Sequence, residues 1–184
     1  MEQRRDNMKT VLAESLRELM LKHLFEKITI KQISDASGVI RVTFYNYFDD
    51  KYDCLNYIAE QDLAAPFRED GLRVGTDQAV ERVLRTVQEN RAFYQAAYRV
   101  TGQNSFEEMV TQNLTKVFEE YLSIHRKRGF MEQYPDALLA MYYAHSFSFH
   151  IRRFAFIKNG EETVESMNQT IHDLTRTPIS GFIE

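Results

Sequence analysis

The stretch that decides the fold is residues 28–51, which read ITIKQISDASGVIRVTFYNYFDDK. Thr29 is followed three residues later by Gln32, and this spacing of a hydroxyl and an amide is typical of the capping box that starts a helix. Gly38 can adopt the left-handed conformation that ends such a helix at little cost. The pattern therefore predicts a short helix over residues 30–37, closed by a turn at Gly38.

A second short helix is expected over residues 40–48, directly after that turn. Phe44 and Phe48 are four residues apart, so they share one face, which we expect to pack against the core. The positions left facing outward are Arg41, Val42, Thr43, Tyr45, Asn46 and Tyr47. Arginine can pair with guanine edges, threonine and asparagine can reach bases or phosphates, and tyrosine hydroxyls suit phosphate oxygens. The two short helices and the turn between them therefore predict a helix-turn-helix whose second helix lies in the major groove of double-stranded DNA.

The rest of the chain also has a helical pattern. Apolar residues recur at three- and four-residue steps, and no convincing alternation of apolar and polar residues predicts a strand. The expected helices span about residues 6–24, 30–37, 40–48, 50–65, 77–89, 90–100, 106–129, 135–158 and 161–175. We expect Ala36 to face inward from the second of these helices and Leu174 to lie on the apolar stripe of the last. Pro66 and Gly71 predict a loop over residues 66–76. The expected fold class is all-α, with about nine helices.

The composition agrees with the all-α class and argues against several kinds of functional site. Apolar residues make up 43% of the 184 residues and charged residues 27%, and only seven Gly and three Pro are present, as expected for a globular helical protein. The single cysteine, Cys54, excludes an intrachain disulfide and a cysteine-based zinc site. Glycine-rich phosphate loops, nucleophile elbows and zinc-protease motifs do not occur. We therefore expect no enzyme activity, no cofactor and no metal.

Charge gives a DNA-binding function little support. The formal net charge is −4, and residues 1–52 carry nine Lys and Arg against eight Asp and Glu. The placement of individual side chains must therefore carry the case. The first residues are polar and no run approaches about eighteen apolar residues, so we expect a cytoplasmic protein that does not enter the membrane.

Within the quoted stretch, residues 28–39, 41, 43–48 and 50–51 resemble the DNA-binding module of the TetR family of transcriptional regulators. The resemblance implies an all-α homodimer, with a helix-turn-helix DNA-binding domain over residues 1–50 and an effector-binding and dimerisation domain over residues 51–184. The last two helices are expected to form a four-helix bundle with those of the second copy. The function implied is transcriptional regulation, with repression favoured, under the control of a small-molecule or partner-protein effector.

The same resemblance gives roles to individual residues. Arg41 and Thr43 would lie near base edges of the operator DNA. The DNA backbone would be contacted by Tyr45, Tyr47, Thr29 and Lys51, the last two from helix N-termini.

Two positions depart from the family pattern. Ile40 stands where a small polar N-cap is usual before the recognition helix, and losing such a cap typically costs about 0.5–2 kcal/mol. Val42 stands where Gly or Pro is common, and its methyl groups could contact a thymine methyl. Both changes bear on which operator sequence is recognised.

The C-terminal part resembles, more faintly, the branch of the family that includes regulators of dihydroxyacetone kinase operons. The similarity lies in residues 90–94, in the helix start at Ser105 and in residues 157–160. This branch implies that the effector could be a partner protein. If the effector is a small molecule, its pocket should be mostly apolar with a few polar groups. The aromatic candidates are Phe93, Tyr94, Tyr98, Phe106, Phe118, Tyr121, Tyr142 and Tyr143, of which we predict Tyr94, Tyr98, Phe118 and Tyr142 to line the pocket, although each could be simple core.

Other interpretations fit some of the same residues. An interaction module could keep this fold and have lost operator binding, as Ile40 and the acidic net charge suggest. His145 and His150 are five residues apart, about 140° around a helix, so they are not expected to share a metal. Arg152 and Arg153 are expected either to pair with acidic residues of the partner subunit or to face solvent.

Overall fold

The computed structural model describes residues 2–69, 76–126, 129, 133–158 and 160–176, and helices make up all the regular secondary structure in this part of the chain. The elements are α1 (Glu2–Met20), η1 (Phe25–Lys27), α2 (Ile30–Ala36), α3 (Arg41–Tyr45), α4 (Lys51–Ala59), η2 (Glu60–Ala64), α5 (Ala65–Glu69), α6 (Thr76–Glu89), α7 (Arg91–Ala97), α8 (Phe106–His125), α9 (Asp136–Phe156) and α10 (Val164–Arg176). Because α4, η2 and α5 continue as one helix, the described residues form nine helices besides the short 3-10 turn η1. The predicted all-α class is confirmed.

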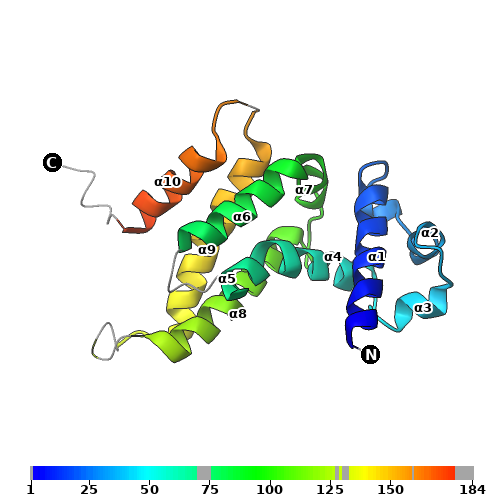
Figure 1. The fold of residues 1–184 in the computed structure, drawn as a ribbon, viewed down its shortest axis with the longest axis horizontal. Helices are drawn as coiled ribbons and strands as arrows, with labels where there is room; N and C mark the ends of the chain where they lie inside the picture. The colour runs from blue at the N-terminus through cyan, green and yellow to red at the C-terminus, as the bar shows by residue number, and fades with distance from the viewer. Residues whose placement is uncertain (1, 70–75, 127–128, 130–132, 159, 177–184) are drawn as a thin grey trace.

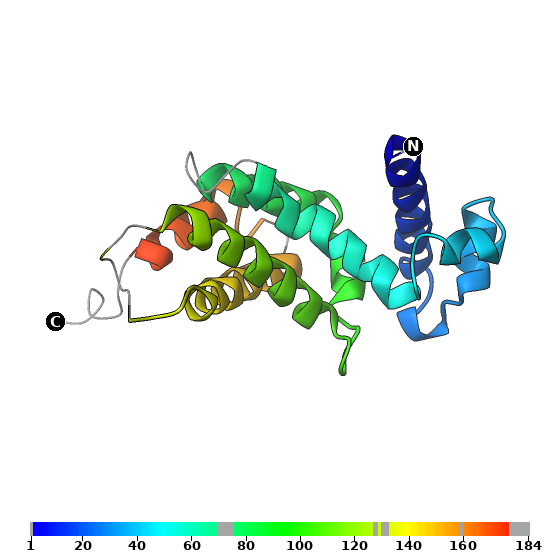
Figure 2. The same cartoon turned by 90° about the horizontal axis from the view of Figure 1, so that it is seen from below.

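The helices form an elongated molecule with α1, α2 and α3 at one end (Figures 1 and 2). The helix made of α4, η2 and α5 leaves this end and runs into the larger helical part. There α8 and α9, of 20 and 21 residues, pack against each other along their length. The end of the molecule that carries α10 lies far from α3 (Figure 1).

A small shared core fixes α3 to α1 and α2. Leu12 and Leu16 of α1, Ile33 of α2 and Phe44 of α3 have no exposed surface. Fully burying such a side chain is worth about 1.5–3 kcal/mol. These four residues therefore hold α2 and α3, of seven and five residues, against α1, although helices this short would not be stable in isolation. Gly38 has a φ of 68°, the left-handed value that lets the chain turn between α2 and α3.

The fourth helix corrects the prediction of a loop from residue 66. The helix continues through a buried Pro66 to Glu69, after a π-helical turn at Glu60–Ala64. A proline inside a helix normally clashes with the carbonyl four residues earlier. The wider π turn displaces the carbonyls in front of Pro66, which allows the helix to pass it. Residues 70–75 of the predicted loop lie outside the described residues.

Two smaller expectations on apolar faces are also corrected. Ala36 was expected to face inward from α2 but is exposed, and Ser34 is buried in its place. Leu174 was expected on the buried stripe of α10, but 46% of its side chain is exposed. Both residues lie in the last turn of their helices, where the backbone leaves the packed face.

Within the described residues, no helix combines the length and the apolar character needed to cross a membrane.

Candidate nucleic-acid interface and effector pocket

The outer surface of α3 carries the side chains predicted to contact DNA. Arg41, Val42, Tyr45 and Asn46 are exposed, and Thr43 and Tyr47 are half-buried. Behind them, the buried ring of Phe44 packs edge-on against Tyr45 and at a tilt against Phe48, with centroids 5.7 Å apart in both cases. The helix therefore presents one polar and aromatic surface outward from a rigid base.

The N-terminus of α3 shows the predicted departure from the family pattern. Ile40 is the N-cap, its backbone is extended, and its side chain forms no capping hydrogen bond. The side chain is 71% exposed next to Arg41 and Val42. An apolar group therefore stands on the surface where a hydroxyl would otherwise be available to a phosphate.

Thr29 begins α2 through the predicted capping box. Its backbone N–H donates to Gln32 Oε1 over 2.8 Å, and the backbone N–H of Gln32 donates to Thr29 Oγ1 over 3.3 Å. The Thr29 hydroxyl also donates to Gln32 Oε1 over 2.9 Å. Thr29 is exposed at the start of α2 and is held in a single arrangement by these bonds.

Lys51, predicted to contact the DNA backbone, is hydrogen-bonded within its own chain in this structure. Its ammonium donates to the backbone carbonyls of Phe25, Ile28 and Glu26 over 2.8, 3.0 and 3.2 Å. Because an ammonium has three N–H donors, these carbonyls satisfy all of them. Burial lowers the pKa of Lys51, against the opposing effect of Glu26 and Asp50. The side chain thus ties η1 to the start of α4 and, in this arrangement, offers no donor to a phosphate.

A buried polar cluster joins the N-terminal helices to the rest of the molecule. Arg17 of α1 donates to Asp62 Oδ2 in the π turn over 2.5 Å, and the hydroxyl of Tyr94 in α7 donates to the same oxygen. The Arg17 guanidinium also lies 4.6 Å from the ring centroid of Phe93. Three helices therefore meet at one carboxylate (Asp62).

The charges of this cluster support one another. Burial by itself would lower the pKa of Arg17, but the charge and hydrogen bond of Asp62 outweigh it, so that this pKa is raised. Burial raises the pKa of Tyr94, and the nearby Asp62 carboxylate adds to the rise. Tyr94 thus remains a neutral hydroxyl donor, and Arg17 and Asp62 form an ion pair that is largely removed from water.

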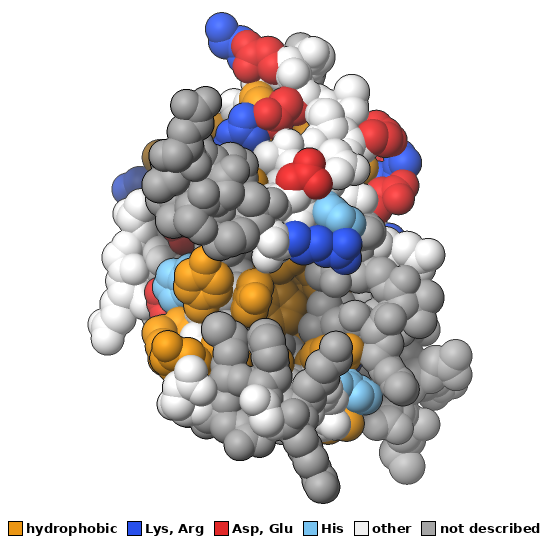
Figure 3. All heavy atoms as spheres, turned by 90° about the vertical axis from the view of Figure 1, so that its left-hand side faces the viewer, with side chains coloured by type: hydrophobic (Ala, Val, Ile, Leu, Met, Phe, Trp, Pro, Cys, Tyr) orange, Lys and Arg blue, Asp and Glu red, His pale blue; other side chains and the backbone are white. Residues whose placement is uncertain are grey.

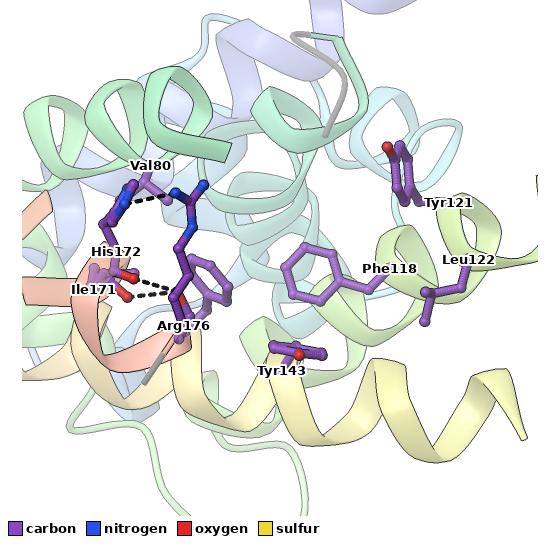
Figure 4. Close-up of a pocket in the computed structure, with 10 residues that line it drawn as sticks. Val80, Phe118, Tyr121, Leu122, Tyr143, Ile171, His172 and Arg176 are labelled. Atoms are coloured by element: carbon purple, nitrogen blue, oxygen red, sulfur yellow. Dashed lines mark hydrogen bonds between the residues drawn. The ribbon is translucent and has the colours of Figure 1, made fainter. Parts of the chain in front are cut away.

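The larger part of the molecule contains an apolar cavity of about 280 Å3 between α6, α8, α9 and α10. Its lining residues are Val80, Phe118, Tyr121, Leu122, Tyr143, Phe147, Ile171, His172, Thr175 and Arg176. Figure 4 shows Phe118 pointing from α8 into this space, with His172 and Arg176 of α10 on the opposite side. The wall is thus largely apolar and aromatic, with tyrosine hydroxyls on α8 and α9, and the cationic side chain among the described lining residues stands on α10.

Of the four residues predicted to line a pocket, Phe118 lies in this cavity. Tyr94 belongs to the buried cluster with Asp62, and Tyr98 is buried against Phe106 with ring centroids 5.0 Å apart. Tyr142 lies on the outer side of α9 with 70% of its side chain exposed.

Several cavity residues had only a weak signal in the sequence. Tyr121 and Tyr143 belonged to the wider aromatic set, whereas His172, Thr175 and Arg176 were not singled out. These three follow Ile171 on α10 at steps of one, four and five residues, which places them beside its apolar stripe. Such a polar border is common on solvated helices, so their role depends on how α10 packs.

Three phenylalanines connect the cavity to the long helix that leads to α1. Phe67 of α5 packs edge-on against Phe118 and Phe147, with centroids 5.4 Å away in each case, and the centroids of Phe118 and Phe147 are 5.5 Å apart. Phe67 is fully buried, five residues after Asp62 on the same continuous helix. The cavity wall and the Arg17–Asp62 pair are therefore attached to one rigid element.

The outer face of α9 carries an exposed stripe that we call the α9 stripe, made of Leu138, Tyr142, His145, Phe149, Arg152 and Phe156. These positions alternate steps of four and three residues, the 3.5-residue period of helices that pack against a partner helix. Phe149 is 61% exposed, an unusual state for a phenylalanine.

The two histidines of α9 lie on different faces, as the spacing predicted. His145 is exposed, whereas His150 is buried and its Nδ1 has no hydrogen-bond partner in the described structure. Arg152 pairs with Glu107 over 3.1 Å, and Arg153 pairs with Glu162 over 2.5 Å. Both arginines thus have acidic partners within their own chain. Among the described residues, no three His, Cys, Asp or Glu side chains gather to hold a metal ion.

Comparison with known proteins places this geometry in a family. The TetR C-terminal family model, described as a transcriptional regulator C-terminal region, matches residues 76–177, more than half of the chain. A curated relative is the HTH-type dhaKLM operon transcriptional activator DhaS of Lactococcus lactis, 28% identical over 88 residues. That match covers 48% of this chain and 47% of the relative, so it spans about half of the relative's length.

Solved structures share the fold over almost the whole chain. The dihydroxyacetone kinase operon activator DhaS superposes with a TM-score of 0.65 at 19% identity, covering 91% of this chain and 93% of that one. A TetR-family regulator from Syntrophomonas wolfei gives a TM-score of 0.66 at 18% identity, covering 97% of each chain. Thermus thermophilus FadR, a TetR-family repressor in complex with lauroyl-CoA, gives 0.60 at 18% identity, covering 96% of this chain and 95% of that one.

The family model and the solved structures both place this all-helical fold among transcriptional regulators. The chain belongs to the TetR family of transcriptional regulators. The relatives that these comparisons return are transcriptional regulators, in agreement with the predicted function.

Proposed function

We propose that the chain is a homodimeric, operator-binding regulator of the cytoplasm, in which residues 1–50 recognise DNA and residues 51–184 bind an effector and dimerise. The observation that supports this most is the outward surface of α3, with Arg41, Val42 and Tyr45 exposed over the buried ring of Phe44. A helix of this kind that needed only to be soluble would not require an arginine, two tyrosines, a threonine and an asparagine on its open side.

The predicted DNA-binding side chains differ in whether they can contact the bases or the backbone of the DNA. Arg41 and Thr43 stand near the N-terminal end of α3, which in a helix-turn-helix contacts base edges. Val42 offers methyl groups to thymine, and Asn46 can reach a base or a phosphate. Tyr45, Tyr47 and Thr29 would contact the DNA backbone. Lys51 would act indirectly, because its bonds to the carbonyls around η1 fix where α2 begins.

A second copy of the chain is the partner that the α9 stripe fits. Its period of 3.5 residues and its exposed Tyr142 and Phe149 match the seam of a helix bundle. The exposed positions of α10 are mostly polar, for example Glu165, Gln169 and Asp173, so α9 would supply most of the apolar contact within the bundle of last helices. In such a dimer the two α3 helices should stand about 34–36 Å apart, one turn of DNA.

The effector would act through the helix that carries Phe67 and Asp62. A ligand or partner protein that favours one position of Phe118 and Phe147 changes the packing on Phe67. Because Asp62 on the same helix holds Arg17, a shift of that helix would move α1 and with it α3. An effector changes operator affinity only if it binds the two arrangements with different affinity.

The test is a footprint on the DNA upstream of the gene for this protein and of its neighbours. We expect protection of two half-sites related by a two-fold axis, with centres about one helical turn apart. Among the similar proteins, the curated relative is named an activator and the Thermus thermophilus neighbour a repressor. Transcription from that promoter is therefore measured with and without the protein, to distinguish repression from activation. Absence of any protected site would favour an interaction module that has lost operator binding.

A further inference from the structure

Building on the proposed effector role of residues 51–184, we propose that the cavity between α6, α8, α9 and α10 binds a small apolar molecule that carries one carboxylate. The described walls of the cavity are mostly apolar and aromatic, and a cationic side chain of α10 stands at its edge. The walls would bind the apolar body of a ligand, and the cation would bind its carboxylate.

The walls select the body of the ligand. Val80, Leu122 and Ile171 contribute aliphatic surface from α6, α8 and α10, and Phe118 and Phe147 contribute aromatic surface from α8 and α9. Seen from this end of the molecule, hydrophobic side chains gather in a hollow with basic and histidine side chains at its edge (Figure 3). Burying an alkyl chain here is favourable by about 0.8 kcal/mol for each CH2 group.

The edge formed by α10 selects the charge. Arg176 Nη1 lies 2.8 Å from Nε2 of His172 and donates to it, because a guanidinium can only donate. The positive charge of this guanidinium therefore stands at the edge of the cavity. Both residues lie in the last turns of α10 on the same side of the cavity (Figure 4).

The acidic groups nearby are engaged elsewhere. Among the ten described residues that line the cavity, none is acidic. Glu81 and Glu165 lie on the other side of His172, and both pair with Arg85, over 2.6 and 3.2 Å. Among the described residues, the charge at the cavity edge is thus positive, and a carboxylate would complement it through charge-assisted hydrogen bonds.

The volume gives a scale for the size of the ligand. About 280 Å3 corresponds to roughly nine water molecules at about 30 Å3 each. An eight-carbon carboxylate is a probe of about this size. A neutral molecule of the same shape would leave Arg176 without a counter-charge, and an amine would place two positive charges together.

The experiment measures binding of three eight-carbon probes to the full chain by titration calorimetry: octanoate, octanamide and octylamine. We expect octanoate to bind at least about tenfold more tightly than octanamide, because one hydrogen bond between charged groups contributes enough binding free energy for that difference. Octylamine should bind more weakly than either. Arg176→Gln should bring octanoate to the affinity of octanamide and leave octanamide unchanged. Arg99→Gln removes the same charge from the surface near the end of α1, outside the cavity, and should change nothing.

A second variant tests the site independently of the charge. Leu122→Trp fills the cavity, so it should abolish binding of both octanoate and octanamide while the melting temperature shows that the chain is folded. Equal affinity for octanoate and octanamide, or octanoate binding that Arg176→Gln does not change, would overturn the proposal, and so would no binding of octanoate at all. Operator binding by the ligand-free protein is measured alongside, so that loss of the regulator function is seen separately from loss of this ligand class.

Discussion

Arg41 is the side chain of α3 best placed to distinguish one base pair from another, because it is exposed at the first position of the helix. Its guanidinium can form two hydrogen bonds to a guanine, and a pair of this kind contributes about 1–3 kcal/mol of discrimination. We expect Arg41→Ala to weaken operator binding by roughly that amount and to relax specificity at one base position. Fluorescence anisotropy on operators with single base changes measures both effects, with Arg99→Ala as the control. Equal affinity of Arg41→Ala and the unchanged protein would exclude this contact.

The ion pair between Arg17 and Asp62 makes a prediction on stability. Both side chains are largely buried, so removing one partner leaves an uncompensated charge. Arg17→Met should therefore lower the free energy of unfolding by about 3–5 kcal/mol, and adding Asp62→Leu should restore much of the loss. Urea denaturation of the two variants measures this. A loss below about 1 kcal/mol for Arg17→Met would show that the pair does not hold α1 to the π turn.

His150 makes a prediction on pH dependence. Burial, with a smaller contribution from Arg153, lowers the pKa of this imidazole, and Glu162 only partly opposes the shift. The folded state therefore binds its proton less readily than the unfolded state, so that stability falls as the pH drops below the ordinary histidine pKa of about 6.5. Between about pH 7 and pH 5 the unfolding free energy of the unchanged protein should fall more steeply than that of His150→Leu. Parallel slopes for the two proteins would contradict the prediction.

At the scale of elements, the α9 stripe is expected to control association. Phe149→Glu puts a charge at the centre of an apolar seam, so we expect it to shift the protein from dimer to monomer and to weaken operator binding. Sedimentation velocity at micromolar concentration measures the first effect. Leu21→Glu is the matched control, because Leu21 is also an exposed apolar residue but lies beyond the end of α1, beside Ala96 and Arg99 and outside the α9 stripe. A Phe149→Glu protein that remains dimeric would place the interface elsewhere.

The elements that could be predicted from the sequence are those set by local signals. Thr29 and Gln32 start α2, Gly38 ends it, and Asp50 caps α4 by accepting hydrogen bonds from the N–H groups of Tyr52 and Asp53. Each of these signals acts within three residues of itself. The continuation past Pro66 was missed because it depends on a π turn, which has no comparable signal in the sequence.

Side-chain roles that depend on distant residues were harder to predict. The outward face of α3 follows from helix geometry once Phe44 and Phe48 are turned inward. Arg41, Val42, Tyr45 and Asn46 are exposed as predicted, whereas Thr43 and Tyr47 are half-buried and Tyr47 also packs against the core. Lys51 reaches carbonyls more than twenty residues earlier in the chain, and Tyr94 reaches Asp62 in another helix. Neither contact is visible in a spacing along one helix, and the same is true of the cavity that Arg176 borders.

At the scale of the whole molecule, α3 lies at one end and the helices that line the cavity lie toward the other, joined by one continuous helix (Figure 1). That helix touches the cavity wall at Phe67 and the DNA-binding end at Asp62 and Lys51. Because packed side chains and buried ion pairs deform little, a displacement at one end would be transmitted over the length of the helix, as the proposed effector mechanism requires.

The salt dependence of operator binding tests most directly the claim that this fold binds DNA through α3. Labelled operator DNA is titrated with the protein at about 50 and about 200 mM salt. If the dimer replaces counterions at six to ten phosphates, affinity should fall by roughly 10³- to 10⁵-fold between the two conditions. Arg41→Ala should lower affinity at both concentrations. Binding that is insensitive to salt, or the absence of binding at the lower concentration, would contradict the account.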